Sequence, residues 1–329
     1  MAEQTTYTRP VGGSSPSGPT KMAKQDIKKP KHQVSLKLGA RPSTSKKVLR
    51  FQKTVWDFYK KNKRDFPWRK TKDPYKILVS EIMLQQTQAD RVVKFYETWI
   101  NRFPDFKSLA QAKLSEIYPF WQGLGYNRRA LALQKTAQKV MAEFGGKLPK
   151  DILQLETFPG IGPYTARAVA IFAYQAKIAC IETNIRRVFI HHFFGDKTDI
   201  EDKQILKIAE RALPADGRSG KAGLARVSPG NARKWHWALM DYGAYLKSQV
   251  PNPNRRHKNY SVQPKFEGSF RQIRGALLKM LSGKPMEAKE LAMRIKKLTG
   301  QNSDRTKKVI ADLEKEGLII RNENVYSLN

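Results

Sequence analysis

Apolar residues recur through residues 48–250 at the three- to four-residue spacing of amphipathic helices, and prolines, glycines and short polar stretches interrupt them. This pattern predicts helices over residues 49–62, 73–87, 91–103, 108–118, 128–144, 151–157 and 163–174, a helix starting at residue 184, and one over residues 235–246. The pattern therefore predicts an all-α domain that covers residues 48–250.

The flanking segments have different patterns. Residues 1–47 have no apolar periodicity and carry ten basic residues against two acidic ones, so we expect a disordered basic tail. Residues 214–234 are polar and glycine-rich, which predicts a flexible loop. Residues 251–267 are extended and basic, which predicts a linker.

Helical periodicity returns in residues 268–329, which we expect to form a second domain. Helices are predicted over residues 270–281, 286–297 and 303–316, followed by a β-hairpin whose turn lies at residues 322–324. Three helices followed by two strands are typical of a winged helix, a helix-turn-helix variant that binds either DNA or protein. Basic residues near the second and third helices favour DNA.

The charge of the chain points to its partner. The sequence has 62 Lys and Arg residues against 29 Asp and Glu, a net charge of +33, with a pI near 10.2. Such a balance favours nucleic acid, and no apolar run reaches the roughly 18 residues that a membrane span needs. The single cysteine, Cys180, excludes disulfides within the chain and zinc or iron–sulfur sites built on several cysteines. It fits a reducing, intracellular setting.

The sequence Phe-Pro-Gly-Ile-Gly at residues 158–162 lies between two predicted helices. Gly160 and Gly162 permit a tight turn, and Pro163 is suited to the first position of the following helix. Backbone N–H groups at such a turn bind phosphate with the help of the helix dipole. An isolated G-x-G is usually only a loop, but the helical flanks and the basic charge favour a helix-hairpin-helix that binds the DNA backbone.

Two acids occur where carboxylates are unexpected. Glu81 lies in an otherwise apolar helix, and Glu182 ends an apolar run at residues 178–182. Glu81 alone is equally consistent with a residue on the polar side of its helix. As a pair in one cleft, the two could protonate a leaving base and stabilise the cationic sugar, which is what cleavage of an N-glycosidic bond requires.

Residues 48–246 resemble the helix-hairpin-helix DNA glycosylases of the endonuclease III superfamily, and within it the MutY-type adenine DNA glycosylases. The matching motifs are FPWR (66–69), DPYKILVSEIMLQQTQ (73–88), WQGLGY (121–126), LETFPGIGPYTA (155–166) and ETNIRRV (182–188). The resemblance implies an endonuclease III-like domain for these residues, and the small winged-helix domain predicted from the pattern of residues 268–329 follows it.

The resemblance also implies roles for single residues. Glu81 matches the acid that protonates adenine, Glu182 the second carboxylate and Asn184 its neighbour. Tyr164 stands where bifunctional lyases carry a Schiff-base lysine, which implies a monofunctional enzyme. The expected base pocket contains Trp68 and Arg69. The expected DNA contacts are Gln85, Gln86, Tyr126, Gly160, Gly162, Arg186, Arg255 and Arg256.

The sequence departs from the family in three places. The family has aspartate where this chain has Glu182. The four cysteines of the family's iron–sulfur cluster are absent, so no cofactor is expected beyond an optional monovalent cation at the hairpin, residues 158–162. The winged helix stands in place of the larger C-terminal domain that recognises 8-oxoguanine.

The sequence therefore predicts a monomeric, intracellular base-excision repair glycosylase that removes adenine mispaired with guanine or 8-oxoguanine in double-stranded DNA. Two alternatives stay open. One is a thymine or uracil mismatch glycosylase of the same superfamily, whose members also carry tyrosine at the position of Tyr164. The other is a non-catalytic DNA-binding clamp.

Overall fold

The structure is a computed structural model, which describes residues 45–214, 232–300 and 303–329 of the 329-residue chain. The predicted tail therefore lies outside the described residues apart from its last three positions, and so does most of the predicted loop over residues 214–234. Among the described residues, no helix is both long and apolar enough to cross a membrane.

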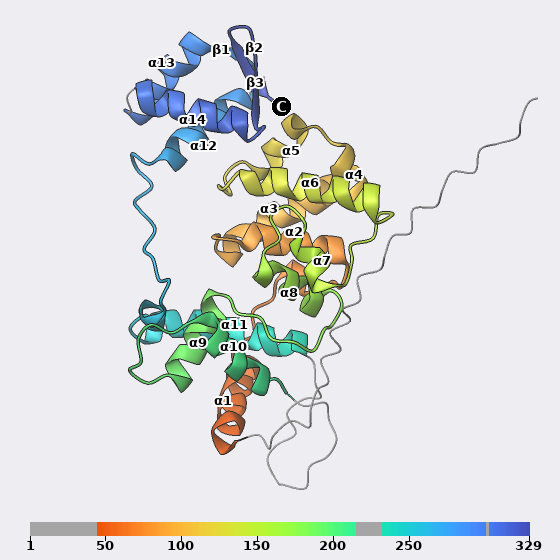
Figure 1. Ribbon diagram of the computed structural model, residues 1–329, viewed down its shortest axis with the longest axis vertical. Helices are drawn as coiled ribbons and strands as arrows, with labels where there is room; N and C mark the ends of the chain where they lie inside the picture. Colours follow the sequence, from red (N-terminus) through yellow and green to blue (C-terminus); the bar gives the residue numbers. More distant parts are fainter. Residues whose placement is uncertain (1–44, 215–231, 301–302) are drawn as a thin grey trace, which may run out of the picture. The chain divides into compact units, whose positions relative to one another are not determined.

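Short helices make up the first part of the described chain (Figure 1). They are α1 (Lys46–Asn62), the 3₁₀ turn η1 (Pro67–Arg69), α2 (Pro74–Leu84), α3 (Ala89–Arg102), α4 (Phe106–Gln111), α5 (Leu114–Trp121), α6 (Arg128–Glu143), α7 (Ile152–Glu156) and α8 (Pro163–Phe172). The single helix predicted over residues 108–118 is wrong. Asp105 caps α4, and Glu116 closes a capping box at the start of α5, so the chain forms two helices there.

A second helical group follows, with α9 (Thr183–Phe193), α10 (Asp202–Arg211), α11 (Ala232–Gln249) and the 3₁₀ turn η2 (Pro253–Arg256). The helix α11 begins three residues before the predicted start at residue 235. It packs against both α9 and α1, while η2 packs against α9. The helix α9 is thus held between α11 and η2.

The C-terminal elements are α12 (Phe270–Leu281), β1 (Met286–Glu287), α13 (Ala288–Thr299), α14 (Ser303–Lys315), β2 (Ile319–Asn322) and β3 (Val325–Leu328). The strands form an antiparallel sheet in the order β1-β3-β2, with Met286 opposite Tyr326 and Ile319 opposite Leu328. The helix predicted over residues 286–297 is wrong at its first two positions, because these residues pair with β3. The predicted hairpin is present.

The helix α2 lies at the centre of the N-terminal helices. Asp73 caps its first turn and Pro74 opens it, as the sequence predicts. Seven consecutive residues, 77–83, are buried, and α2 packs against α3, α6, α8 and η1 (Figure 1). Because α2 is surrounded, any polar side chain on its buried stretch has to find its partner inside the protein.

A glycine allows α9 and α11 to approach each other closely. A Cβ atom on Gly243 of α11 would lie 2.3 Å from the backbone oxygen of Asn184 in α9, closer than such atoms can come. The same backbone supplies a further contact, because the carbonyl of Gly243 accepts a hydrogen bond of 2.7 Å from Arg187. The approach of these two helices fixes the start of α9.

We expect Gly243→Ala to lower the free energy of unfolding by about 1–3 kcal/mol, because the added methyl group must push α9 away from α11. Thermal unfolding followed by circular dichroism measures the effect. Gly275→Ala is the matched control, since a Cβ atom there in α12 meets nothing within 4 Å. It should leave stability unchanged or raise it by about 0.5–1 kcal/mol. Equal stability of the two variants would contradict the close approach.

Candidate active site

Glu81 is a buried acid on the central helix α2. Its side chain faces α8, and it is only 4% exposed. The hydroxyl of Tyr164, in the first turn of α8, donates a 2.8 Å hydrogen bond to its Oε2 atom. Burial raises the pKa of Glu81 to about 7, against the opposing effect of this hydrogen bond. Glu81 is thus about half protonated at neutral pH.

Glu182 caps the N-terminus of α9. Its Oε1 atom accepts the backbone N–H of Ile185 at 2.8 Å, and its Oε2 atom accepts the side-chain amide of Asn184 at 3.2 Å. Burial raises the pKa of Glu182, against the opposing effect of the backbone N–H groups of Asn184 and Ile185 and of the nearby Arg187 and Arg186. The charge of Glu182 in turn raises the pKa of Glu81, so the two carboxylates influence each other. The structure therefore brings Glu81, Tyr164, Glu182 and Asn184 into one site.

Two residues other than these four, Arg187 and His236, support the segment around Glu182. Neither contact is predicted by the sequence patterns. The buried Arg187 donates to the Oδ1 atom of Asn184 at 2.7 Å, which orients the amide toward Glu182. The buried His236 of α11 accepts the backbone N–H of Cys180 at 3.2 Å through Nε2. Its Nδ1 atom lies 2.6 Å from the carbonyl of Ala232, which fixes the tautomer that carries its proton on Nδ1.

Arg69, an expected pocket residue, forms a buried ion pair. Its guanidinium makes a bidentate contact with Asp241 of α11, at 2.8 and 2.9 Å. Arg64 donates to the same carboxylate at 2.7 Å, and the side chain of Asp241 is 1% exposed. The positive charge of Arg69 lowers the pKa of Glu81, so the pair borders the site. Trp68 is buried and stacked on Phe66, with ring centroids 4.9 Å apart.

The expected hairpin is present as α7, a turn and α8. Gly160 has φ +76°, and a Cβ atom there would lie 2.8 Å from Ala132, so the turn needs glycine on two counts. Gly162 is the N-cap residue of α8 and is exposed. The side chain of Gln85 donates to the carbonyl of Gly160 and to Thr165, both at 3.2 Å. Gln85 is thus bound to the turn, while its neighbour Gln86 is exposed.

The remaining expected DNA contacts differ in their surroundings. Tyr126 is 39% exposed in the turn before α6. Arg186 forms a bidentate ion pair with Asp202, at 2.6 and 2.7 Å. Arg255 is exposed, whereas Arg256 is half-buried and donates to the carbonyl of Ile190 at 3.5 Å. Of these arginines, only Arg255 presents its side chain to solvent without one of these contacts.

The residues after α11 do not fit an iron–sulfur cluster. The segment contains no cysteine, and Cys180 is buried elsewhere, in the core. Asn254 is buried in η2 and donates to the carbonyl of Thr183 at 3.0 Å, and His257 lies 3.2 Å from Asp202. Within the described part of the chain, no group of three or more His, Cys, Asp or Glu residues has the arrangement of a metal site.

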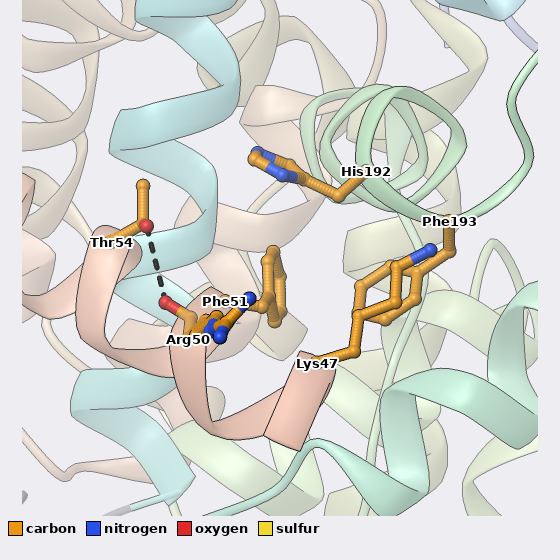
Figure 2. A pocket seen from close by; sticks show the side chains of 6 residues that line it. All are labelled: Lys47, Arg50, Phe51, Thr54, His192 and Phe193. Carbon is orange, nitrogen blue, oxygen red and sulfur yellow. Dashed lines mark hydrogen bonds between the residues drawn. The ribbon is translucent and has the colours of Figure 1, made fainter. Parts of the chain in front are cut away.

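A separate pocket of about 380 Å³ lies at the other end of α9 (Figure 2). Its lining comes from α1 and α9: Lys47, Arg50, Phe51, Thr54, His192 and Phe193. Nine residues of helix lie between the N-cap residue Glu182 and His192, which corresponds to a rise of about 15 Å along the axis. This pocket therefore takes no part in the arrangement around Glu81 and Glu182.

Residues 79–215 match the model of the HhH-GPD superfamily of base excision DNA repair proteins. The adenine DNA glycosylase of Mycolicibacterium smegmatis is 34% identical over 244 residues, which are 68% of this chain and 78% of that protein. The thymine/uracil-DNA glycosylase of Methanothermobacter thermautotrophicus is 31% identical over 207 residues, 62% of this chain and 87% of that protein.

Among solved structures, a thermostable thymine-DNA glycosylase matches with a TM-score of 0.54 and 32% identity, over 62% of this chain and 88% of that one. The endonuclease III-like helical fold predicted for the N-terminal region is therefore confirmed. The matches to adenine and to thymine/uracil glycosylases are comparably close. This chain belongs to the HhH-GPD superfamily of base excision DNA repair proteins and is a DNA glycosylase.

Proposed function

We propose that this glycosylase is monofunctional and removes adenine mispaired with guanine or 8-oxoguanine from double-stranded DNA. The observation that carries the proposal is the buried Glu81, whose pKa of about 7 keeps a proton available at neutral pH. A purine leaves as a neutral base only if one of its ring nitrogens is protonated while the glycosidic bond breaks. A buried acid that titrates near neutrality is suited to that task.

In the proposed reaction, protonated Glu81 transfers its proton to N7 of adenine. The C1′–N9 bond breaks, its electron pair stays with the base, and a cationic sugar remains. The carboxylate of Glu182, oriented by Asn184 and the backbone of α9, stabilises that cation. Water then adds to C1′ and gives up a proton to the Glu81 carboxylate, which restores the acid and leaves an abasic site.

One feature of the sequence supports this choice of base, and a second supports the monofunctional mechanism. The segment over residues 80–87, SEIMLQQT, resembles the adenine-removing branch. Tyr164 occupies the position of the lyase lysine and its hydroxyl is bound to Glu81, so we expect no Schiff base there. DNA strands should therefore remain intact until the abasic sites are treated with alkali.

The second candidate is removal of thymine or uracil mispaired with guanine. The thymine/uracil-DNA glycosylase of Methanothermobacter thermautotrophicus supports it, because its match to this chain extends over most of its own length. A pyrimidine leaves with a negative charge. The positive guanidinium of Arg69, which is paired with Asp241 near Glu81, would therefore have a larger effect on the rate of that reaction.

For residues 268–329 we propose a winged helix that contacts DNA. The order α12-β1-α13-α14-β2-β3, with β1 on the far side of β3 from β2, supports this. The unit contains 13 basic and 7 acidic residues. Lys296 and Lys297 at the end of α13 and Lys307 on α14 are exposed, which suits contacts with phosphates.

The choice of base is tested with the purified chain and end-labelled duplexes that carry A:8-oxoG, A:G, T:G or U:G, with and without alkali. We expect breaks at adenine only, and only after alkali. Breaks at thymine or uracil alone would support the second candidate. Binding without an abasic site in any duplex would indicate a non-catalytic clamp, and breaks without alkali would contradict a monofunctional enzyme.

Glu81→Gln should lower the single-turnover rate by at least about 10²-fold, since the amide has no proton to give, with little change in affinity for the duplex. Glu97→Gln, on the exposed surface of α3, is the control and should retain full activity.

The pH dependence of the free energy of unfolding tests the burial of the Glu81 carboxyl group. The wild type should lose stability as the pH rises from 4.5, the ordinary pKa, to about 7, and this loss should be absent in Glu81→Gln. Full activity of the variant would remove Glu81 from the acid role.

The rate of base release should fall as the pH rises through about 7, because only protonated Glu81 is active. Tyr164→Phe removes the hydrogen bond that lowers this pKa, so the descending limb should move up by about one pH unit. Single-turnover rates from pH 5 to 9 measure the shift. Tyr174→Phe is the control, since among the described residues that hydroxyl donates to the carbonyl of Leu148 and not to Glu81. If the descending limb of the pH–rate profile stays in place or moves to lower pH in Tyr164→Phe, the assignment of its pKa to Glu81 is contradicted.

A further inference from the structure

Two short loops carry exposed side chains on unusual backbone. Residues 85–88 follow α2, and residues 123–127 precede α6. Gln86 has φ +59° and Tyr126 has φ +49°, and both side chains are exposed. This left-handed conformation costs a residue other than glycine roughly 1 kcal/mol or more, so it persists only where the surroundings impose it. Something must hold both loops in these shapes.

Arg129 contacts both loops. It lies in the first turn of α6 and is 8% exposed. Its Nη1 atom donates to three carbonyls at the end of α2 and in the first loop, and Nη2 donates to that loop and to the second one. The acceptors of Nη1 are the carbonyls of Ile82 (2.9 Å), Met83 (2.9 Å) and Gln85 (2.5 Å), and those of Nη2 are Thr87 Oγ1 (3.2 Å) and the carbonyls of Leu124 (3.3 Å) and Gly125 (3.0 Å).

The contacts continue at the Tyr126 turn itself. The Nε atom of Arg129 donates to the carbonyl of Tyr126 at 3.4 Å, and its guanidinium carbon lies 5.4 Å from the centre of the Tyr126 ring. On the other side it lies 5.3 Å from the ring of Trp121. One planar group thus touches both neighbours of Gln86, through the carbonyl of Gln85 and the hydroxyl of Thr87, and both the backbone and the ring of Tyr126.

Within the part of the chain that the structure describes, Arg129 has seven hydrogen-bond acceptors, and all are neutral oxygens. Burying a guanidinium against neutral dipoles is costly, and burial lowers the pKa of Arg129 to about 10, which still leaves it charged at neutral pH. A surface arginine would serve equally well for general attraction to DNA. The burial and the number of contacts therefore indicate a role in shaping the two loops.

We propose that Arg129 is a positioning residue that sets the placement of Gln86 relative to Tyr126 and thereby the discrimination of the base opposite the target. The role rests on the proposed function and on the DNA contacts that the resemblance implies for Gln86 and Tyr126, which we expect to lie at the base opposite the target. Lysine cannot replace Arg129, because an ammonium is a point donor with three protons and cannot span acceptors in two loops.

The test compares Arg129→Lys with Lys135→Ala, a control that removes a positive charge from an exposed position of the same helix. The first measurement is the single-turnover ratio of adenine release opposite 8-oxoguanine to release opposite cytosine. We expect the ratio to fall at least about tenfold in Arg129→Lys, as the loss of one charge-assisted bond would cause, and to be unchanged in Lys135→Ala.

The second measurement does not depend on which base is removed. A duplex with 2-aminopurine opposite a tetrahydrofuran abasic analogue reports stacking on the opposite purine through its quenched fluorescence. At saturating protein we expect quenching with the wild type and with Lys135→Ala, and its loss with Arg129→Lys and with the reference variant Tyr126→Ala. Wild-type quenching in Arg129→Lys, or its absence in the wild type, would overturn the proposal.

A milder variant guards against misfolding of Arg129→Lys. Thr87→Val removes one of the seven acceptors at a partly exposed position, and it should change both readouts in the same direction by a smaller factor. If the wild type releases no adenine but quenching still requires Arg129, the choice of base is wrong and the positioning role stands. If the wild type releases adenine and both variants keep its ratio and its quenching, the positioning role is wrong.

Discussion

The burial of the Glu81 carboxyl group is the constraint on which the site depends. A carboxyl on a helix that is surrounded by other helices can stay there only if it is neutral or receives a hydrogen bond, and Tyr164 supplies that bond from α8. The nearby charge of Glu182 acts in the same direction as burial, since both favour the protonated form of Glu81. The packing of α2 against α8 therefore also buries Glu81 and thereby raises its pKa to about 7.

Glu182 is also buried, and burial raises its pKa, but its surroundings differ from those of Glu81. Its position at the N-cap gives it a backbone N–H and the positive end of a helix, which lower its pKa against burial. The two carboxylates thus lie in different environments, one on a central helix and one at an N-cap, and such a difference is the usual basis for dividing acid and electrostatic roles. The glutamate side chain accepts the backbone N–H of Ile185, three residues on, which is the contact of an N-cap acid.

The sequence patterns predicted those features that depend on neighbouring residues in the chain. Glu81 stood out as an acid in an apolar helix, and Asp73-Pro74 marked where that helix begins. Arg129 and Asp241 went unnoticed, because their importance arises from contacts with residues far away in sequence, up to 177 positions for Asp241 and Arg64. The strand β1 was missed for a similar reason: two residues have no periodicity, and only pairing with β3 makes them a strand.

The absence of cluster cysteines bears on the same site, because the segment after α11 packs on the helix that carries Glu182 at its start. Asn254 of η2 holds the carbonyl of Thr183, one residue after that acid, and Ile200 pairs with His257 in a parallel bridge. His257 and Arg186 both contact Asp202, which ties α9 to α10. Hydrogen bonds and an ion pair thus support the start of α9. The residues of this segment therefore act on Glu182 through the backbone that follows it, by holding the first turn of α9 in place.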